Sequence, residues 1–229
     1  VNKIQYNFGG NYIEKEKLNK PAIPFFFFLN PTLQILSFFK YLSKIKFLFL
    51  SEINLNFMYL KLPIKRYNNT LEFLLKVLPP PATILDLGVR NPFSEIMEQN
   101  GYTVYNTNGE DLDLVPEIVN DYKIDAVTSF EIFEHLLSPF SVLNEIKAKH
   151  LITTVPLNLW FANAYRSKTD MRDRHYHEFE DWQFDWLLEK SGWKIIESEK
   201  WTSPTNQIGF RPILRKFTPR YYAIYATKE

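Results

Sequence analysis

The sequence contains no cysteine, few glycines and no long apolar run. With 0 Cys in 229 residues, the chain can form no disulfide, no thiolate metal site and no thiol nucleophile, and we expect it in a reducing, cytoplasmic environment. Its 7 glycines against 14 prolines leave little for a glycine-rich phosphate loop. No stretch reaches the roughly 18 to 20 apolar residues that cross a bilayer. A net charge of +1 gives no overall field to hold a polyanion, which disfavours nucleic acid as a partner.

Residues 1–57 differ in composition from the rest of the chain. They contain no Asp, Arg, His or Trp and are rich in Phe, Leu, Ile, Lys, Asn and Tyr. One hypothesis is that the native chain starts at Met58 and that residues 1–57 are translated upstream sequence, because AT-rich DNA encodes these residue types. The other is a genuine apolar and basic extension, which would pack on the protein or lie on a membrane surface through residues 23–50. The sequence thus predicts an extension, 1–57, and a domain, 58–229, with membrane contact expected only through 23–50.

Strands and helices alternate from Met58 onward. The pattern predicts helices at 67–77, 92–100, 114–122, 138–146 and 180–190, and strands at 83–88, 103–105, 124–130, 150–155, 193–201 and 221–227. The last two strands have no predicted helix between them, so we expect an antiparallel pair at one edge of the sheet. The predicted fold class is α/β: a Rossmann-like, mostly parallel sheet flanked by helices, with an antiparallel C-terminal hairpin.

Three segments follow strands at the edge where such sheets bind ligands, namely 86–88, 130–136 and 155–158. With these segments, the chain resembles the class I S-adenosylmethionine-dependent methyltransferases, of the small-molecule type with a Glu-x-x-Glu-His-Leu motif, here Glu131 to Leu136. The resemblance covers about residues 71–228, and it includes the 84–88 segment, the 177–179 segment and the C-terminal hairpin. It implies S-adenosylmethionine as the cofactor and O-methylation of a small-molecule acceptor. It also implies that one strand–helix unit of the fold is reduced to residues 112–122.

The residues implied to bind the cofactor lie at the ends of the first three strands. They are Asp86, Gly88, Asn91, Asn108, Asp111, Phe130 and Glu131. Gly88 is the one glycine retained from the family's glycine-rich first motif. The backbone amides that follow Asn91 are free to receive a carboxylate if they open a helix. Asn108 or Asp111 would accept a ribose hydroxyl where the family has an acidic residue, although an ordinary Asn-Gly turn explains the same residues.

The Glu131, Glu134 and His135 side chains would share one face if their segment were helical. Two carboxylates and an imidazole suit Mg²⁺ or Mn²⁺, and the resemblance implies His177 as a further ligand. Such an ion would lower the pKa of the acceptor hydroxyl. The alternative is a metal-free transfer, with His135 and Glu134 as catalytic residues or with proximity alone driving the reaction.

Two other functions stay open on the same residues. The loss of glycines and of the ribose acid fits a catalytically degenerate binding module that keeps the fold. The Glu-x-x-Glu-His motif fits an RNA 2′-O-methyltransferase, which the near-neutral charge opposes. Fold alone does not identify the methyl acceptor, and nothing in the sequence determines the oligomeric state.

Aromatic and basic residues outside the motifs suggest further contacts. Trp160, Phe161 and Tyr165 are candidates for contacts with the acceptor, whereas Trp182 and Trp186 recur at helical spacing and are predicted to lie in the core. The basic residues near the C-terminus are interpreted either as a solvated hairpin surface or as a contact for a phosphate-bearing acceptor; they are Arg211, Arg215, Lys216 and Arg220.

Overall fold

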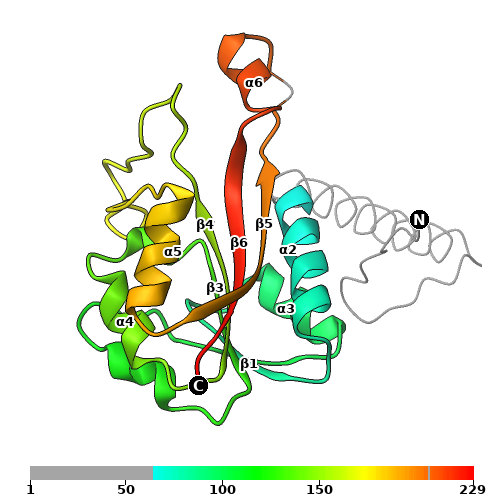
Figure 1. Ribbon diagram of the computed structural model, residues 1–229, viewed down its shortest axis with the longest axis vertical. Coiled ribbons are helices and arrows are strands. Elements are labelled where there is room, and N and C mark those ends of the chain that lie inside the picture. The colour runs from blue at the N-terminus through cyan, green and yellow to red at the C-terminus, as the bar shows by residue number, and fades with distance from the viewer. Residues whose placement is uncertain (1–63, 206) are drawn as a thin grey trace, which may run out of the picture. The chain divides into compact units, whose positions relative to one another are not determined.

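A six-stranded sheet with the order β2-β1-β3-β4-β6-β5 forms the centre of the protein (Figure 1). The strands are β1 (Thr83–Asp86), β2 (Thr103–Asn106), β3 (Ala126–Phe130), β4 (His150–Pro156), β5 (Lys194–Thr202) and β6 (Pro219–Thr227). The first four strands are parallel, and β6 runs antiparallel to both β4 and β5. The predicted fold class, a mostly parallel sheet closed by an antiparallel C-terminal hairpin, is confirmed.

This computed structural model describes residues 64–205 and 207–229, and residues 67–229 form one compact unit. The predicted extension, 1–57, and the predicted membrane contact, 23–50, lie outside the described residues. In the part of the chain that the structure describes, no helix is both long enough and apolar enough to cross a membrane.

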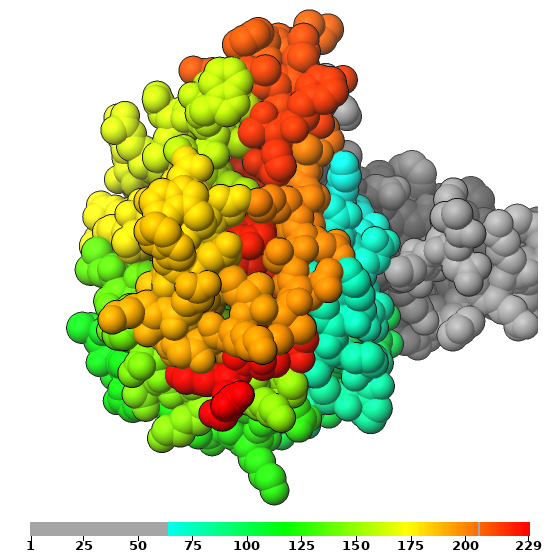
Figure 2. Space-filling view, in the orientation of Figure 1, coloured from blue at the N-terminus to red at the C-terminus, as the bar shows by residue number. Residues whose placement is uncertain are grey.

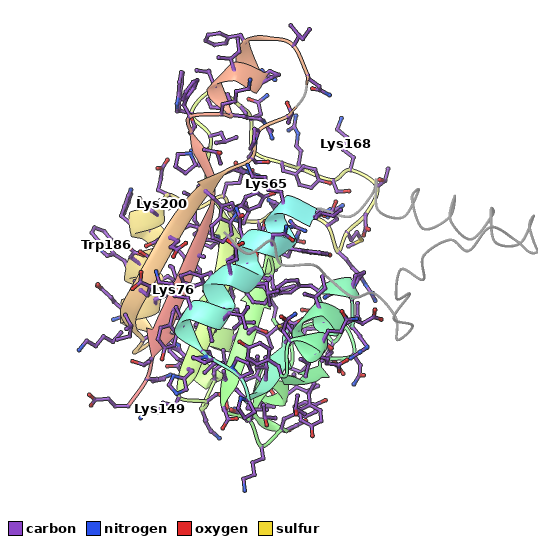
Figure 3. All side chains as sticks on the ribbon, turned by 90° about the vertical axis from the view of Figure 1, so that its right-hand side faces the viewer. Lys65, Lys76, Lys149, Lys168, Trp186 and Lys200 are labelled. Atoms are coloured by element: carbon purple, nitrogen blue, oxygen red, sulfur yellow. The ribbon has the colours of Figure 1, made fainter. Side chains whose placement is uncertain are left out.

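Helices cover both faces of the sheet (Figure 1). On one face lie α2 (Ile64–Val77) and α3 (Pro92–Gln99), and on the other lie α4 (Pro139–Glu145) and α5 (Asp181–Lys190). Lys76 of α2 pairs with Glu197 at 2.9 Å and with Glu199 at 2.8 Å, which joins this helix to the edge strand β5 (Figure 3). Sequence patterns predicted these four helices, although α2 begins at Ile64, three residues before its predicted start.

Two short elements differ from the prediction. The segment between β2 and β3 holds only the 3₁₀ helix η1 (Pro116–Asn120) in place of an α-helix over 114–122. The predicted reduction of one strand–helix unit is therefore confirmed, in a more compact form. Between β5 and β6 the chain forms a short helix, α6 (Phe210–Leu214), which the sequence analysis did not predict. Gly209 precedes it with φ of 152°, a conformation that glycine adopts far more readily than other residues, so the chain can turn there.

The core under α4 and α5 is built from alternate residues of the strands. Leu85, Val127 and Leu151 are fully buried there, together with Phe184 and Leu188 of α5. This alternation is the two-residue period of a strand that is covered on both faces.

The prediction that Trp182 and Trp186 lie in the core is wrong. They are 47% and 62% exposed and pack against each other at 4.8 Å between ring centroids. Helix α5 has two stripes with a spacing of four residues. The sheet buries the stripe of Phe184 and Leu188, and the tryptophans take the outer one.

In sheets with this reversal of strand order, the ligand-binding crevice is expected outside the carboxyl ends of the strands, here β1 and β3. The chain passes from β1 to β2 on one side and returns to β3 on the other side of β1. In open α/β sheets, ligands bind where the winding reverses in this way. Asp86, Asn106 and Phe130 are the last residues of the three strands that meet at this edge.

Candidate functional site

The Asp86 carboxylate lies buried beneath the crevice and joins four elements. It accepts hydrogen bonds from Thr128 Oγ1 on β3 at 2.8 Å, from Asn106 Nδ2 on β2 at 3.2 Å and from Ser94 Oγ on α3 at 3.4 Å. Burial raises the pKa of Asp86 from its ordinary 3.8 to about 7, although the three donors favour the ionised form. Asp86 therefore joins the ends of β1, β2 and β3 to helix α3, and its contact with a cofactor stays a prediction.

The loop after β1 turns at Gly88, whose φ is 101°. Its N–H donates to Thr107 Oγ1 at 2.8 Å, and its carbonyl accepts from Asn106 Nδ2 at 3.4 Å. A β-carbon added at Gly88 would lie 3.4 Å from Ile132 Cδ1, in a left-handed conformation that other residues rarely adopt. These bonds hold the loop after β1 against the end of β2.

Arg90 and Asn91, which follow Gly88 in the same loop, both bond to residues of helix α3. Arg90 forms two bonds with the Glu98 carboxylate, at 2.9 and 2.6 Å, so its guanidinium does not fill the crevice. Asn91 caps α3: its side-chain oxygen accepts from Phe93 N–H at 2.8 Å and from Ser94 N–H at 3.4 Å. The amides that were expected to receive a carboxylate are thus already bonded within the protein.

Asn106 was not singled out in the sequence and is the polar residue best placed at the end of β2. Its amide nitrogen binds Asp86 and Gly88, while its Oδ1 is buried and has no hydrogen-bond partner among the described residues. A buried acceptor without a donor is costly unless something completes it. The signal that could have identified Asn106 is its register opposite Asp86.

The predicted ribose residues lie further out in the turn that follows β2. Asn108 is exposed, and its N–H donates to Glu110 Oε2 at 2.7 Å. Asp111 is exposed as well and accepts from the Asp113 N–H at 3.0 Å. Both residues perform ordinary turn chemistry here, which is the alternative that the sequence analysis left open.

Glu131 lies just after β3 in a left-handed conformation, with φ of 59°. Its N–H donates to the Thr154 carbonyl at 3.0 Å, and its Oε1 accepts from Thr154 Oγ1 at 3.1 Å. A non-glycine residue in this conformation is uncommon and is concentrated at functional sites. The preceding Phe130 packs edge-on against Phe93 at 5.2 Å between centroids. The predicted shared helical face is absent, because helix η2 covers only Phe133–His135.

Glu134, His135 and His175 form a cluster whose potential ligand atoms lie within 4.8 Å of one another, with Glu134 buried and the two histidines partly exposed. His135 Nδ1 lies 3.0 Å from the Arg174 carbonyl, which can only accept, so Nδ1 carries the proton. Its Nε2 faces Glu134 Oε1 at 3.7 Å. Burial, followed by the neighbouring His135, lowers the pKa of His175 and so favours its neutral form. The cluster therefore combines one carboxylate with two imidazoles.

The predicted ligands Glu131 and His177 do not join this cluster. His177 Nε2 lies 3.3 Å from the Leu137 carbonyl, and the ring stacks on Phe179 at 5.4 Å between centroids. The N–H groups of Tyr176 and His177 both donate to the Glu134 carbonyl, so the chain bends there and His175 faces the cluster in place of His177. His177 instead lines a hollow of about 530 Å³ beside the start of α4.

Glu178 and Arg220 form an ion pair next to His175 of the cluster. Arg220 donates to the Leu157 carbonyl at 2.6 Å and lies 3.5 Å from Glu178 Oε1. Both side chains are largely buried, so Arg220 is not part of a solvated basic surface. Glu178 Oε1 also accepts from the Tyr165 N–H at 2.7 Å, and the Tyr165 ring lies 4.8 Å from that of His175. Tyr165 thus lies next to the cluster, and its contact with an acceptor stays a prediction.

Solved structures with the same architecture identify the fold. The chain is similar to the 1,6-didemethyltoxoflavin-N1-methyltransferase of Burkholderia thailandensis, solved with S-adenosylhomocysteine, with a TM-score of 0.52 and 15% identity over 82% of this chain and 89% of that one. It is also similar to a SAM-dependent methyltransferase of Archaeoglobus fulgidus, with a TM-score of 0.50 and 17% identity over 71% and 94% of the two chains. The fold is that of class I S-adenosylmethionine-dependent methyltransferases. No protein-family model and no curated protein matches the sequence.

In terms of this methyltransferase fold, the residues described above fall into two groups. Asp86, Gly88 and Asn106 lie together at the ends of β1 and β2. Glu134, His135 and His175 lie together beyond β3 and the loop after β4. At identities of 15% and 17% the comparisons concern the fold alone, so the chemistry must be argued from these two groups.

Proposed function

We propose that the protein is an S-adenosylmethionine-dependent methyltransferase. The observation that carries the proposal is the buried, unpartnered Oδ1 of Asn106, beside Asp86 and the left-handed Gly88, at the edge where this fold binds ligands. A ribose hydroxyl would supply the donor that this oxygen lacks. Asn106 thus fits the place of the acidic residue that the resemblance implied.

The loop after β1 would contact the cofactor through its backbone, and its side chains would leave room for the cofactor. Gly88 keeps the backbone close to β2, and Arg90 stays turned toward Glu98. Asn91 already accepts hydrogen bonds from the first amides of α3. The carboxylate in the methionine portion of S-adenosylmethionine would therefore need a different donor or cation. Bound S-adenosylmethionine would supply a methyl group on a positively charged sulfur.

We propose an oxygen of a small molecule as the methyl acceptor, with His135 as the general base. Because Nδ1 donates to the Arg174 carbonyl, the neutral tautomer keeps its lone pair on Nε2, the nitrogen that faces Glu134. Nε2 would take the proton of the acceptor hydroxyl, and the Glu134 carboxylate 3.7 Å away would stabilise the resulting imidazolium. A hollow of about 530 Å³, which is lined by Leu137, Tyr176 and His177 and not by His135 itself, is large enough for a small-molecule acceptor.

The same cluster supports a second proposal, a divalent metal ion held by Glu134, His135 and His175. One carboxylate and two imidazoles suit Mn²⁺ better than Mg²⁺, which prefers oxygen ligands. This set replaces the one predicted from the sequence, since Glu131 and His177 bond elsewhere. An ion here would lower the pKa of an acceptor hydroxyl, the role that His135 has in the metal-free proposal.

Equilibrium binding separates these proposals from a degenerate binding module. We expect the full chain to bind S-adenosylhomocysteine at one site by calorimetry and to gain about 2.7 kcal/mol of stability at one hundred times the Kd. A chain that unfolds cooperatively but shows neither heat nor a thermal shift would favour the binding module. Transfer of a labelled methyl group to RNA at physiological salt, and not to small hydroxyl compounds, would favour the RNA enzyme.

A further inference from the structure

The tip of the C-terminal hairpin, residues 207–218, exposes large apolar side chains at one end of the molecule. Figure 1 shows α6 above the sheet, beyond the ends of β5 and β6, and Figure 2 shows the tip as a projecting group of orange and red atoms. Phe210, Ile213 and Phe217 are 71%, 54% and 77% exposed, and Ile208 is fully exposed. Single exposed apolar residues are ordinary, but four in so short a projection mark a contact surface.

Basic residues alternate with these apolar ones. Arg211 and Lys216 are exposed and Arg215 is half-buried. The sequence has no Asp or Glu between Lys200 and Lys228, so residues 201–227 contain no carboxylate that could neutralise them. The tip therefore presents apolar side chains and positive charge together, which complements a surface that is apolar inside and negative outside.

A neighbouring loop extends this surface. Trp160, which is 73% exposed, lines a hollow of about 240 Å³ together with Thr218 and Pro219 at the base of the tip, and Glu180, Asp181 and Lys200 line it as well. The two segments are joined where the Leu157 N–H donates to the Arg220 carbonyl at 2.7 Å. Tryptophan is enriched at the boundary between lipid headgroups and acyl chains.

We propose that the tip docks on a lipid bilayer rich in anionic phospholipids. Phe210, Ile213 and Phe217 enter below the headgroups, while Arg211 and Lys216 remain at the phosphates. A lipid surface accounts for the exposed Ile208 and Ile213 better than a single-stranded nucleic acid does, because isoleucine has no ring on which a nucleobase could stack. The contact is separate from residues 23–50, where the sequence predicted membrane contact, and it does not depend on the methyltransferase proposal.

Because the chain has 0 Cys, the single substitution Phe217→Cys allows one environment-sensitive fluorophore to be attached to the tip of the full chain. We expect its emission to shift to the blue with vesicles of phosphatidylcholine and phosphatidylglycerol, and not with phosphatidylcholine alone. The matched control is Trp186→Cys on the outer face of α5, where we expect no shift (Figure 3). An unchanged Phe217→Cys label would overturn the proposal, as would a label that responds to polyuridylic acid and not to vesicles.

Sedimentation with the same vesicles tests the charges. Each cation near an anionic surface contributes about five-fold to partitioning, so the triple variant Arg211→Gln, Arg215→Gln and Lys216→Gln should lose on the order of 100-fold. The control variant Lys147→Gln, Lys149→Gln and Lys194→Gln removes three lysines from other surfaces and should stay close to the unmodified chain. If vesicle binding weakened equally in the two variants, the total positive charge of the protein, and not the position of the cations on the tip, would drive binding. That result would contradict the proposal.

Discussion

The Thr128 hydroxyl donates a hydrogen bond of 2.8 Å to the Asp86 carboxylate, and the two residues are register partners on β1 and β3. Both are buried, so this bond lies in the interior directly under the crevice. A buried carboxyl group favours its protonated form, and a hydroxyl donor opposes that preference. The balance between these two effects decides how the stability of the protein depends on pH.

Asp86 should make the folded protein less stable as pH rises from about 4 to about 7. The carboxyl group ionises near 3.8 in the unfolded chain and near 7 in the folded one, so the folded state binds more protons between these values. The stability that the protonated Asp86 adds is fully present below about pH 4 and is lost as pH rises through 7. The free energy of unfolding should fall by up to about 4 kcal/mol over this range. Urea unfolding of the unmodified chain and of Asp86→Asn should show a difference in free energy that changes with pH in this direction.

The Thr128→Val variant provides the control for that experiment. It removes the hydroxyl donor that favours the ionised carboxylate, so the loss of stability should move to higher pH than in the unmodified chain. If Asp86→Asn keeps the full pH dependence of the unmodified chain, another group is responsible and the account of Asp86 is wrong.

The aromatic residues of α5 should differ widely in their effect on stability. Phe184 is fully buried, and Phe184→Ala should lower the free energy of unfolding by about 3 to 5 kcal/mol. Trp186 is 62% exposed, and Trp186→Ala should change it by less than about 1 kcal/mol. Urea unfolding measures both. Equal losses would restore the prediction that the tryptophans lie in the core.

The Arg220–Glu178 pair should stabilise the protein far more than the Arg90–Glu98 pair. Arg220→Met would leave the Glu178 carboxylate buried with fewer donors, at a cost of about 3 to 5 kcal/mol. Arg90→Met removes an exposed pair and should cost no more than about 1 kcal/mol. Thermal unfolding of the two variants compares them under one condition, and a larger loss in Arg90→Met would contradict the burial of the first pair.

His175 and not His177 should be required if the cluster binds a metal ion. Titration with Mn²⁺, followed by the electron paramagnetic resonance of the free ion, should show one site in the full chain. His175→Ala should weaken it at least ten-fold, as loss of a ligand does, and His177→Ala should leave it unchanged. Absence of binding in the unmodified chain would leave the metal-free proposal, with His135 as base.

The sequence predicted the parts of the fold that depend on local patterns. The apolar strand that ends at Asp86, and the Asn91-Pro92 cap that opens α3, both lie where expected, because caps and strand ends are determined by a few neighbouring residues. Helix α6 was missed because it has only five residues, Phe210–Leu214, and contains Pro212. The choice between the two stripes of α5 was missed because both have the same spacing.

The site was predicted less completely because it depends on contacts between distant segments. The sequence gives no sign that the Glu134 carbonyl bends the chain at residues 176 and 177, so His175 could not be preferred to His177. Asn106 was overlooked because its importance comes from its register opposite Asp86 across two strands. By contrast, Asp86 and Gly88 follow a strand that was recognisable on its own.

The most direct test of the central proposal compares two asparagines at the end of β2. Asn106→Ala should weaken the binding of S-adenosylhomocysteine about ten-fold or more, and Asn108→Ala, in the exposed turn, should leave it nearly unchanged. Two analogues, one without the ribose 2′-hydroxyl and one without the 3′-hydroxyl, should each bind the unmodified chain more weakly than S-adenosylhomocysteine. For the analogue that lacks the hydroxyl bound by Asn106, this loss of affinity should disappear in the Asn106→Ala variant. If the unmodified chain binds both analogues as tightly as S-adenosylhomocysteine, or binds none of the three compounds, Asn106 does not hold a ribose and the account is contradicted.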